Sequence, residues 1–339
     1  MTIKSREIRL ASRPNGLPKP TDFELAETTL PEPGAGEVLV QNTWMSVDPY
    51  MRGRMIDRKS YVPPFQIGQP LEGHAVGKIL ASNNDNFTKG DLVLSMLGWR
   101  EAFISNGEGL QKLDTFGLPP QAFLGVAGMP GLTAWGGLLE IGKPKSGETV
   151  FVSGAAGAVG SLVCQIAKIK GCRVVGSAGS QAKCDWLKSI GVDEVINYKE
   201  HPSQAELMAA LKAAAPDGVD VYFENVGGDH LVAALEAMNM NGRIVVCGLI
   251  SGYNDTEPQP GPWNLFNVIG KSLRIEGFVV TKFMDKTPAF IKDLGEWFAA
   301  GKIQSRETVE HGIENAPTAF LKLFSGGNEG KMLVKLGDE

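Results

Sequence analysis

Up to about residue 120, apolar and polar positions alternate over short stretches, which is the pattern of half-buried β-strands. The predicted strands are residues 37–48, 74–82 and 92–97. The segments between them are rich in Pro, Gly, Asn and Asp, which favour turns. The first part of the chain is therefore predicted to be a β-rich unit.

From about residue 130 onward, strand-like and helix-like patterns alternate. The predicted strands are residues 148–153, 172–178, 194–198, 219–226, 242–250 and 272–280. The predicted helices between them are residues 160–170, 182–190, 203–214 and 228–238. Alternation at this spacing indicates an α/β domain, with helices on both faces of a mostly parallel, doubly wound sheet.

The C-terminal part returns to the mixed character of the beginning. Helices are predicted at 289–303 and 315–325, followed by a last strand at 331–336. We therefore expect the parallel-sheet domain, residues 130–288, to be inserted into a second domain formed by residues 1–129 and 289–339.

Composition narrows the possible functions. The chain has 339 residues, 43% of them hydrophobic, and a formal charge of −5, which is typical of a globular protein and argues against a nucleic-acid surface. Residues 115–139 carry no charge, but their Pro and Gly residues favour a buried connector over a membrane helix. Four scattered cysteines and a first segment without an apolar signal core predict a cytoplasmic protein with reduced thiols.

Glycine is the unusual component, with 42 residues against a usual share of ~7%. Gly154, Gly157 and Gly160 lie directly between a predicted strand and a predicted helix, with Ala156 at the usual middle-glycine position. Small residues there let the backbone approach a pyrophosphate at the helix N-terminus. This turn predicts a dinucleotide site; the alternative is a turn that is tight for packing reasons alone.

The end of the next strand indicates which dinucleotide is bound. An NAD site usually has Asp or Glu there to hold the ribose hydroxyls, but the chain offers Ser177, Ser180 and then Lys183. These polar and cationic residues suit a 2′-phosphate, so NADP(H) is favoured over NAD(H). The alternative for Lys183 is an ordinary solvated lysine.

The other strand ends are expected to complete the site at the carboxyl edge of the sheet. They carry small, polar or aromatic residues: Asn197, Tyr198, Asn225, Gly227, Gly228, residues 247–254 and Phe278.

Two other chemistries find no support in the sequence. His74 stands in a stretch similar to a zinc-enzyme element, but Ala75 occupies the position expected for Glu, and the cysteines all lie from residue 164 onward. We therefore expect no metal site, and His74 to be a hydrogen-bonded structural residue. A serine-hydrolase elbow is also missing.

Several segments in order resemble one enzyme family. They are SVDPYMRGRM at 46–55, the stretch 128–161 around the glycine turn, YFENVGG at 222–228, VCGLISGYN at 246–254 and the tail 312–335. Across nearly the whole chain, the sequence resembles the zinc-independent medium-chain dehydrogenases/reductases. Within them it is most similar to the branch of prostaglandin reductases, plant alkenal double-bond reductases and bacterial NADPH-dependent curcumin reductases.

The resemblance implies a GroES-like catalytic domain, a Rossmann-type NADP-binding domain and a homodimer. It implies pyrophosphate contacts from Gly157, Ala158 and Val159, within the turn Ala156–Gly160, and 2′-phosphate contacts from Lys183 and Tyr198. The nicotinamide half would be lined by Asn225, Cys247, Gly248, Leu249, Ile250, Ser251, Tyr253, Phe278, Val279 and Val280, with Asn328 reaching the cofactor from the tail.

The implied reaction transfers a hydride from NADPH to the β-carbon of an α,β-unsaturated ketone or aldehyde, followed by protonation of the enolate. A hydroxyl would polarise the carbonyl oxygen, with Tyr253 as first candidate and Tyr50, Tyr61 or the cofactor ribose as others. Each tyrosine could instead only pack its ring at the mouth of the site. Quinone reduction and nucleotide binding without catalysis are the alternative functions.

A substrate pocket is expected around the same tyrosines. Met51, together with Met55 and Trp44, would form an apolar wall, and either Arg52 or Arg54 would meet a carboxylate on the substrate. The alternative for Arg52 is pairing with an acidic residue of the protein.

Overall fold

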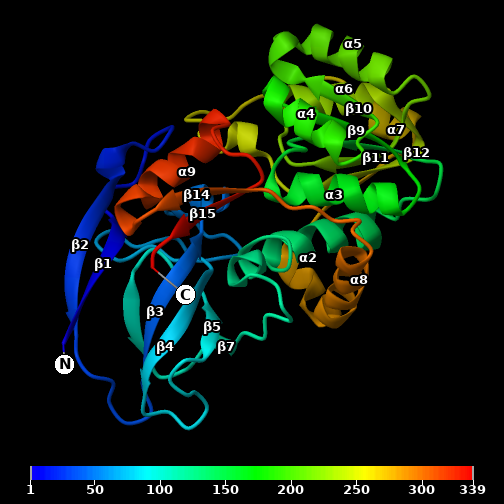
Figure 1. Cartoon of the computed structure of the whole chain (residues 1–339). Helices are drawn as coiled ribbons and strands as arrows, with labels where there is room; N and C mark the ends of the chain where they lie inside the picture. The colour runs from blue at the N-terminus through cyan, green and yellow to red at the C-terminus, as the bar shows by residue number, and fades with distance from the viewer. Residues whose placement is uncertain (1, 338–339) are drawn as a thin grey trace. The chain divides into compact units, whose positions relative to one another are not determined.

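The computed structural model describes residues 2–337, which divide into two compact units (Figure 1). Unit 1 contains the residues up to Gly125 and those from Glu307 onward, and unit 2 is Val126–Arg306. The first boundary, 125/126, lies four residues before the predicted 129/130. The second, 306/307, lies later than the predicted 288/289, because helix α8 (Thr287–Ala299) packs within unit 2. There, Nε1 of Trp135 donates a hydrogen bond of 2.8 Å to the carboxylate of Asp293.

Unit 1 is built from β-sheet, as the alternation of residues predicted. Strands β1 (Ile3–Leu10) and β2 (Phe23–Leu30) pair with each other, and the larger sheet has the order β14-β15-β3-β4-β5-β7 with β6 on β3. Its strands are β3 (Val38–Ser46), β4 (Ala75–Ser82), β5 (Leu92–Ser95), β6 (Ala102–Ser105), β7 (Gln111–Lys112), β14 (Glu307–His311) and β15 (Lys331–Lys335). Antiparallel pairing of Leu333 with Ser46 brings the tail back to the first part of the chain.

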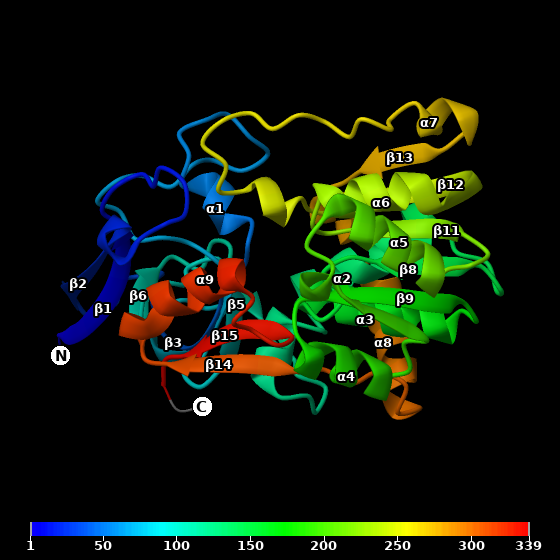
Figure 2. The same ribbon diagram turned by 90° about the horizontal axis from the view of Figure 1, so that it is seen from above.

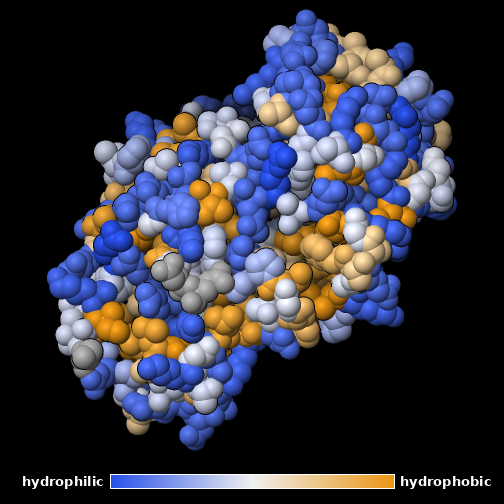
Figure 3. All heavy atoms as spheres, viewed as in Figure 1, coloured by the Kyte–Doolittle hydropathy of each residue, from blue (hydrophilic) through white to orange (hydrophobic). Residues whose placement is uncertain are grey.

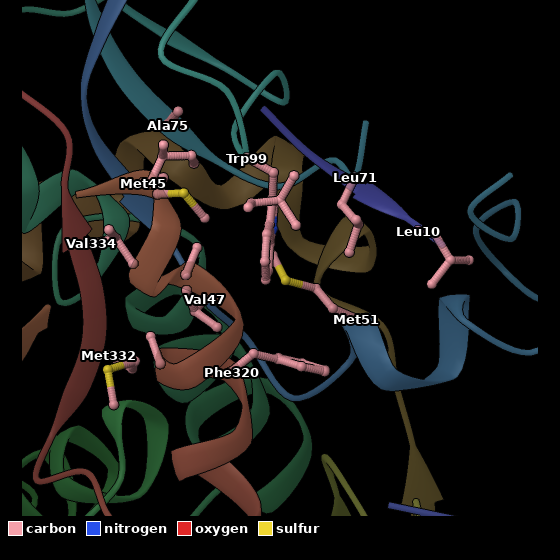
Figure 4. Packing of buried hydrophobic residues seen from close by; sticks show 14 of the residues in the cluster. Leu10, Met45, Val47, Met51, Leu71, Ala75, Trp99, Phe320, Met332 and Val334 are labelled. Carbon is pink, nitrogen blue, oxygen red and sulfur yellow. The ribbon is translucent and has the colours of Figure 1, made fainter. Parts of the chain in front are cut away.

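The core of unit 1 lies between the larger sheet and helix α9 (Ala316–Ser325) (Figure 4). Trp99 is fully buried. Its ring packs edge to face against the ring of Phe320, with the ring centroids 6.1 Å apart. Met51, in the short helix α1 (Met51–Arg54), and Met55 also have no exposed surface and belong to this core. Their sulfur-containing side chains fill the interior of unit 1, and this burial does not support the expected role in the wall of a substrate pocket.

Unit 2 contains, in the part of the chain described, a parallel sheet of the order β10-β9-β8-β11-β12-β13, which Figure 2 shows from above. The strands are β8 (Thr149–Val152), β9 (Arg173–Ala178), β10 (Glu194–Asn197), β11 (Val219–Glu224), β12 (Met238–Val246) and β13 (Arg274–Gly277). The helices are α2 (Met129–Gly136), α3 (Ala158–Ile169), α4 (Gln181–Ser189), α5 (Gln204–Ala214), α6 (Asp229–Ala237), α7 (Asn267–Gly270) and α8. The predicted strands and helices of this domain are confirmed.

The strand order reverses between β8 and β11. From β8 the chain first adds β9 and β10 on one side, and then β11, β12 and β13 on the other. This is the Rossmann order, in which ligands bind at the carboxyl ends of the strands next to the reversal. The β8 residues are entirely buried, and the rings of Phe151 and Tyr222 stack at 4.9 Å between the two central strands.

The uncharged segment 115–139 is more ordered than a connector, since it includes α2. Pro130 stands at the start of the helix, where its missing N–H costs nothing. A Cβ at Gly131 would collide with the Val126 carbonyl, and one at Gly136 with the Phe283 ring. These glycines therefore serve close helix packing, which outweighs their low helix propensity.

Within residues 2–337, helices are all too short or too polar to cross a membrane. On the face seen in Figure 3, hydrophilic side chains cover most of the surface, with smaller hydrophobic groups between them. This distribution is ordinary for a surface that faces water.

Candidate functional site

The glycine turn follows β8 directly and leads into α3. Gly154 has φ +58°, a left-handed conformation that glycine adopts without strain. Gly157 is the N-cap of α3, so no side chain caps the first N–H groups of the helix. A Cβ at Gly160 would collide with the Gly154 carbonyl and lie 2.8 Å from the Cα of Ala155. The backbone of the turn therefore packs closely against the start of α3. The free N–H groups of the first helical turn and the positive end of the helix dipole are available to bind an anion.

The other residues of the turn differ in exposure. Ala156 is only 4% exposed and lies on the inner side of the turn, whereas Ala158 and Val159 are half-buried. A pyrophosphate would therefore meet the backbone at Gly157, Ala158 and Val159, while Ala156 shapes the turn from beneath.

The end of β9 holds the residues expected near a 2′-phosphate. Ser180 is the N-cap of α4, and its Oγ accepts a hydrogen bond from the backbone N–H of Lys183 in the first helical turn. The first turn of α4 carries no acidic residue. Asp185, further along the helix, accepts a hydrogen bond from Gln181. This charge distribution fits a phosphate better than a pair of ribose hydroxyls.

Ser177 differs from the expectation. Its side chain is fully buried, and its Oγ lies 3.0 Å from Nε2 of His230 on α6. Alternate residues of a strand point to opposite faces of the sheet, and Ser177 points into the packed layer. A direct contact between its hydroxyl and a phosphate is therefore not supported.

Tyr198 follows β10 and covers the β9 end from the side. A Cβ at Gly179 would lie 2.6 Å from Oη of Tyr198, so the phenol rests on this glycine. Its ring meets the ring of His230 edge to face, with centroids 5.2 Å apart. Burial raises the pKa of Tyr198, so the group is a neutral hydroxyl at neutral pH.

A buried network that the sequence did not reveal holds the next strand end. Oε1 of Glu224 accepts hydrogen bonds from the Ser153 hydroxyl at 2.8 Å and from the N–H groups of Val226 and Gly227. Asn225 donates from its side-chain amide to the Ser153 carbonyl at 2.7 Å. Burial raises the pKa of Glu224. The only sequence signal was a carboxylate, Glu224, directly after the apolar residues 221–223 at the end of β11.

The loop after β12 lies along this network. The backbone N–H groups of Cys247 and Gly248 both donate to the backbone carbonyl of Glu224. Further along the loop, the N–H of Ile250 donates to the Asn225 carbonyl, and the N–H of Ser251 donates to the Val226 carbonyl. Leu249 is exposed on the outside of the loop.

Tyr253 closes the loop by folding back over its beginning. A Cβ at Gly248 would lie 3.2 Å from Oη of Tyr253, so the phenol stands above the end of β12. The structure therefore brings the Tyr253 hydroxyl and the Asn225 loop to neighbouring strand ends of one sheet.

Phe278 follows β13, and its ring is turned inward. The centroid of this ring lies 6.5 Å from that of Phe223 and 5.3 Å from that of Phe283. Val279 and Val280 are half-buried beside it. At Phe278, the backbone rather than the ring is therefore the part available to a ligand.

The remaining expected site residues belong to unit 1. Tyr50 is half-buried against the unit 1 core, where burial and the Asp48 charge raise its pKa, while the ring of Tyr61 is 65% exposed. Arg52 is buried and donates to the Gly16 carbonyl at 2.8 Å, so its guanidinium faces the protein interior rather than a substrate carboxylate. Asn328 donates to the Gly330 carbonyl in the segment before β15.

Comparison with known proteins places the chain in a family. Residues 6–113 match the family described as the N-terminal domain of oxidoreductases, and residues 158–296 match zinc-binding dehydrogenases. A 2-alkenal reductase (NADP+-dependent) of Nicotiana tabacum is 46% identical, with 99% of both chains covered. An NADPH-dependent curcumin reductase of Escherichia coli is 42% identical over 99% of this chain and 98% of its own.

The similarity extends to three dimensions. The crystal structure of CurA from Vibrio vulnificus in complex with NADPH has a TM-score of 0.92 and 43% identity, covering 98% of this chain and 100% of its own. The chain belongs to the medium-chain dehydrogenases/reductases. The family predicted from the sequence motifs is therefore confirmed.

The description of the second matched family raises the question of a metal in this medium-chain reductase. In the part of the chain described, His, Cys, Asp and Glu side chains form no group of three or more that could hold an ion. Nδ1 of His74 is buried without a hydrogen-bond partner, so the expected hydrogen bond is not formed at this atom. Burial lowers the pKa of His74, Asp48 opposes this shift, and Lys331 adds to it.

Proposed function

We propose that this chain binds NADPH at the β8–α3 turn and reduces the carbon–carbon double bond of α,β-unsaturated ketones and aldehydes, including bulky curcumin-like enones. The observation that carries the proposal is the uncapped glycine turn at the strand-order reversal. Beside it, β9 is followed by α4, whose first turn contains Lys183 and no acidic residue. Similarity to the 2-alkenal reductase and the curcumin reductase, which are 46% and 42% identical to this chain, supports the reduction of a double bond.

The glycine turn fits the cofactor on steric and electrostatic grounds. The N–H groups of Gly157, Ala158 and Val159 would hold the pyrophosphate, and Lys183 would face the 2′-phosphate. Asn225 and the loop Cys247–Tyr253, held by Glu224 and Ser153, would position the nicotinamide end. Bound there, NADPH supplies the hydride that reaches the β-carbon of the enone.

Tyr253 is the proposed hydrogen-bond donor to the substrate oxygen. Its Oη stands over Gly248, where a hydroxyl can stabilise the charge that develops as the carbonyl becomes an enolate. A proton then adds at the α-carbon to complete the reduction. Tyr61 is proposed to contact the substrate and Asn328 the cofactor; Tyr50 is kept as an alternative donor.

The test follows NADPH oxidation with a simple enone, a bulky diarylheptanoid and a quinone as separate substrates. Turnover of the two enones, with the saturated ketone as product, supports the proposal. Turnover of the quinone alone would replace it with quinone reduction. Tight NADPH binding without turnover of any of the substrates would indicate a nucleotide-binding protein without this activity.

We also propose that the chain forms a homodimer through the β13 edge of its sheet. Among residues 2–337, β13 pairs with β12 alone, and unpaired strand edges favour association. The segment 263–270, which ends with α7, exposes large apolar side chains: Trp263 is 62% exposed and Ile269 is 84% exposed. A cytoplasmic location is proposed as well, in keeping with four free cysteines.

Sedimentation of the Ile269→Asp variant tests the dimer. A charge at this exposed position is expected to shift the protein to the monomer without unfolding it. Leu25→Asp, at an exposed apolar position of unit 1, is the matched control and should leave the dimer intact. A monomeric parent protein, or an unchanged dimer in the Ile269 variant, would contradict this interface.

A further inference from the structure

We propose that His230 is a positioning residue for the adenosine end of the cofactor site, which makes it a determinant of the preference for NADPH over NADH. The inference rests on the proposed NADPH function. His230 would act without touching the cofactor, by holding Tyr198 and the end of β9 in place around the 2′-phosphate.

His230 joins three elements of the sheet edge. It lies in the first turn of α6, with its side chain almost fully buried. On one side Nε2 is 3.0 Å from Oγ of Ser177 in β9, and on the other its ring packs against Tyr198 after β10. An aromatic edge-to-face contact and a hydrogen bond fix both the position and the rotation of the imidazole.

Ser177 connects this contact to the glycine turn. Its side chain meets His230, while its backbone carbonyl accepts a hydrogen bond of 2.9 Å from the N–H of Ala155. The same residue therefore joins His230 to the turn that is proposed to hold the pyrophosphate.

Tyr198 transmits the position of His230 to the phosphate-binding turn. Its Oη rests on Gly179, the residue before the α4 N-cap Ser180. Because no side chain fits between Tyr198 and Gly179, the path of the turn depends on where the phenol lies. Ser180 in turn holds the backbone N–H of Lys183, the cation proposed to face the 2′-phosphate.

The chemistry of the histidine suits a fixed, uncharged support. Burial lowers the pKa of His230 to about 4, so the imidazole is neutral at neutral pH. A neutral ring has one donor and one acceptor nitrogen, and the Ser177 hydroxyl can pair with either. The pair would thus hold its geometry without placing a second charge next to Lys183.

The test compares binding of adenosine 2′,5′-bisphosphate and adenosine 5′-monophosphate by calorimetry, together with KM for NADPH and NADH. His230→Ala and His230→Phe are the variants; the phenylalanine retains a ring against Tyr198 but loses the hydrogen bond. We expect His230→Ala to weaken bisphosphate binding and raise KM for NADPH by about five- to tenfold, the effect of one ordinary hydrogen bond. Monophosphate binding and KM for NADH should change less than about twofold, and His230→Phe should fall between the alanine variant and the parent.

Val232→Ala is the matched control, since it also removes a buried side chain from α6. If His230→Ala lowers stability as Val232→Ala does and leaves the preference for the bisphosphate unchanged, His230 is only a core residue and the inference is overturned. Should the alanine variant not fold, His230→Phe and Ser177→Ala decide by the same two measurements.

Lys183→Ala separates this inference from the proposed function. If that variant also leaves the preference for the 2′-phosphate unchanged, the proposed cofactor site is itself wrong. If Lys183→Ala abolishes the preference while the His230 variants retain it, only the positioning role fails.

Discussion

Ser153 and Glu224 join the carboxyl ends of the two central strands of unit 2, because the Ser153 hydroxyl donates a buried hydrogen bond of 2.8 Å to Oε1 of Glu224. Ser153 also accepts from the Tyr222 hydroxyl and from the backbone N–H of Asn225. The strand-order reversal lies between these strands. One buried carboxylate therefore holds the loop proposed to position the nicotinamide.

Glu224→Ala should lower the free energy of unfolding by roughly 2–4 kcal/mol, since it leaves a buried hydroxyl and two N–H groups without their acceptor. Urea unfolding measures the change. Glu224→Gln keeps an acceptor oxygen and should retain most of the stability. Glu296→Ala, on an exposed position of α8, is the control; an equal loss in both alanine variants would contradict the role of this network.

Gly160→Ala should destabilise unit 2 by roughly 1–3 kcal/mol and weaken NADPH binding, because the new Cβ meets the backbone of Gly154 and Ala155. Moving the start of α3 displaces the N–H groups proposed to hold the pyrophosphate. Gly295→Ala is the matched control in α8, where a Cβ has no neighbour within 4 Å. That control should gain about 0.4–1 kcal/mol through reduced freedom of the unfolded chain. Thermal unfolding and NADPH titration of both variants decide the outcome.

Sequence patterns predicted the elements of unit 2 because their information is local. Six apolar runs, the amphipathic segments between them and the glycines that begin two residues after Val152 determine strands, helices and the turn without reference to distant residues. Helix α2 escaped prediction because its Pro and Gly residues have low helix propensity, and close packing against Phe283 outweighs that preference.

The site residues were less predictable because their roles depend on side-chain direction. Ser177 has a suitable hydroxyl at the right strand end, yet it points to His230 inside the protein. Met51 stands in a motif shared with the family, yet it lies in the core of unit 1. In a strand or helix, the direction of a side chain changes from one residue to the next, so neighbouring residues can contact a ligand or pack in the core. The sequence around these positions has no periodicity that distinguishes a ligand-contacting residue from a core residue.

Tyr253→Phe should lower kcat for enone reduction by about a hundredfold, the usual effect of removing one donor to a developing oxyanion, while KM for NADPH changes little. The phenylalanine keeps the ring over Gly248, so the variant tests the hydroxyl alone. Tyr61→Phe, at an exposed position, and Tyr50→Phe are parallel variants. Unchanged turnover in the Tyr253 variant would remove this residue from the mechanism, and a large loss in one of the others would transfer the role to it.

The buried His230 should make the stability of unit 2 fall as the pH is lowered. Its pKa is about 4 in the folded protein against an ordinary value of 6.5, so between these values the unfolded chain binds the additional proton. Stability due to the neutral imidazole is thus complete above about pH 6.5 and is lost progressively down to about pH 4, by up to about 3 kcal/mol. The carboxylate of the neighbouring Asp229 opposes the shift only in part.

Urea unfolding of the parent and of His230→Phe at several pH values isolates this contribution, because the variant lacks the titrating group. A stability difference between the two proteins that does not vary with pH would show that His230 is protonated equally in the folded and unfolded states.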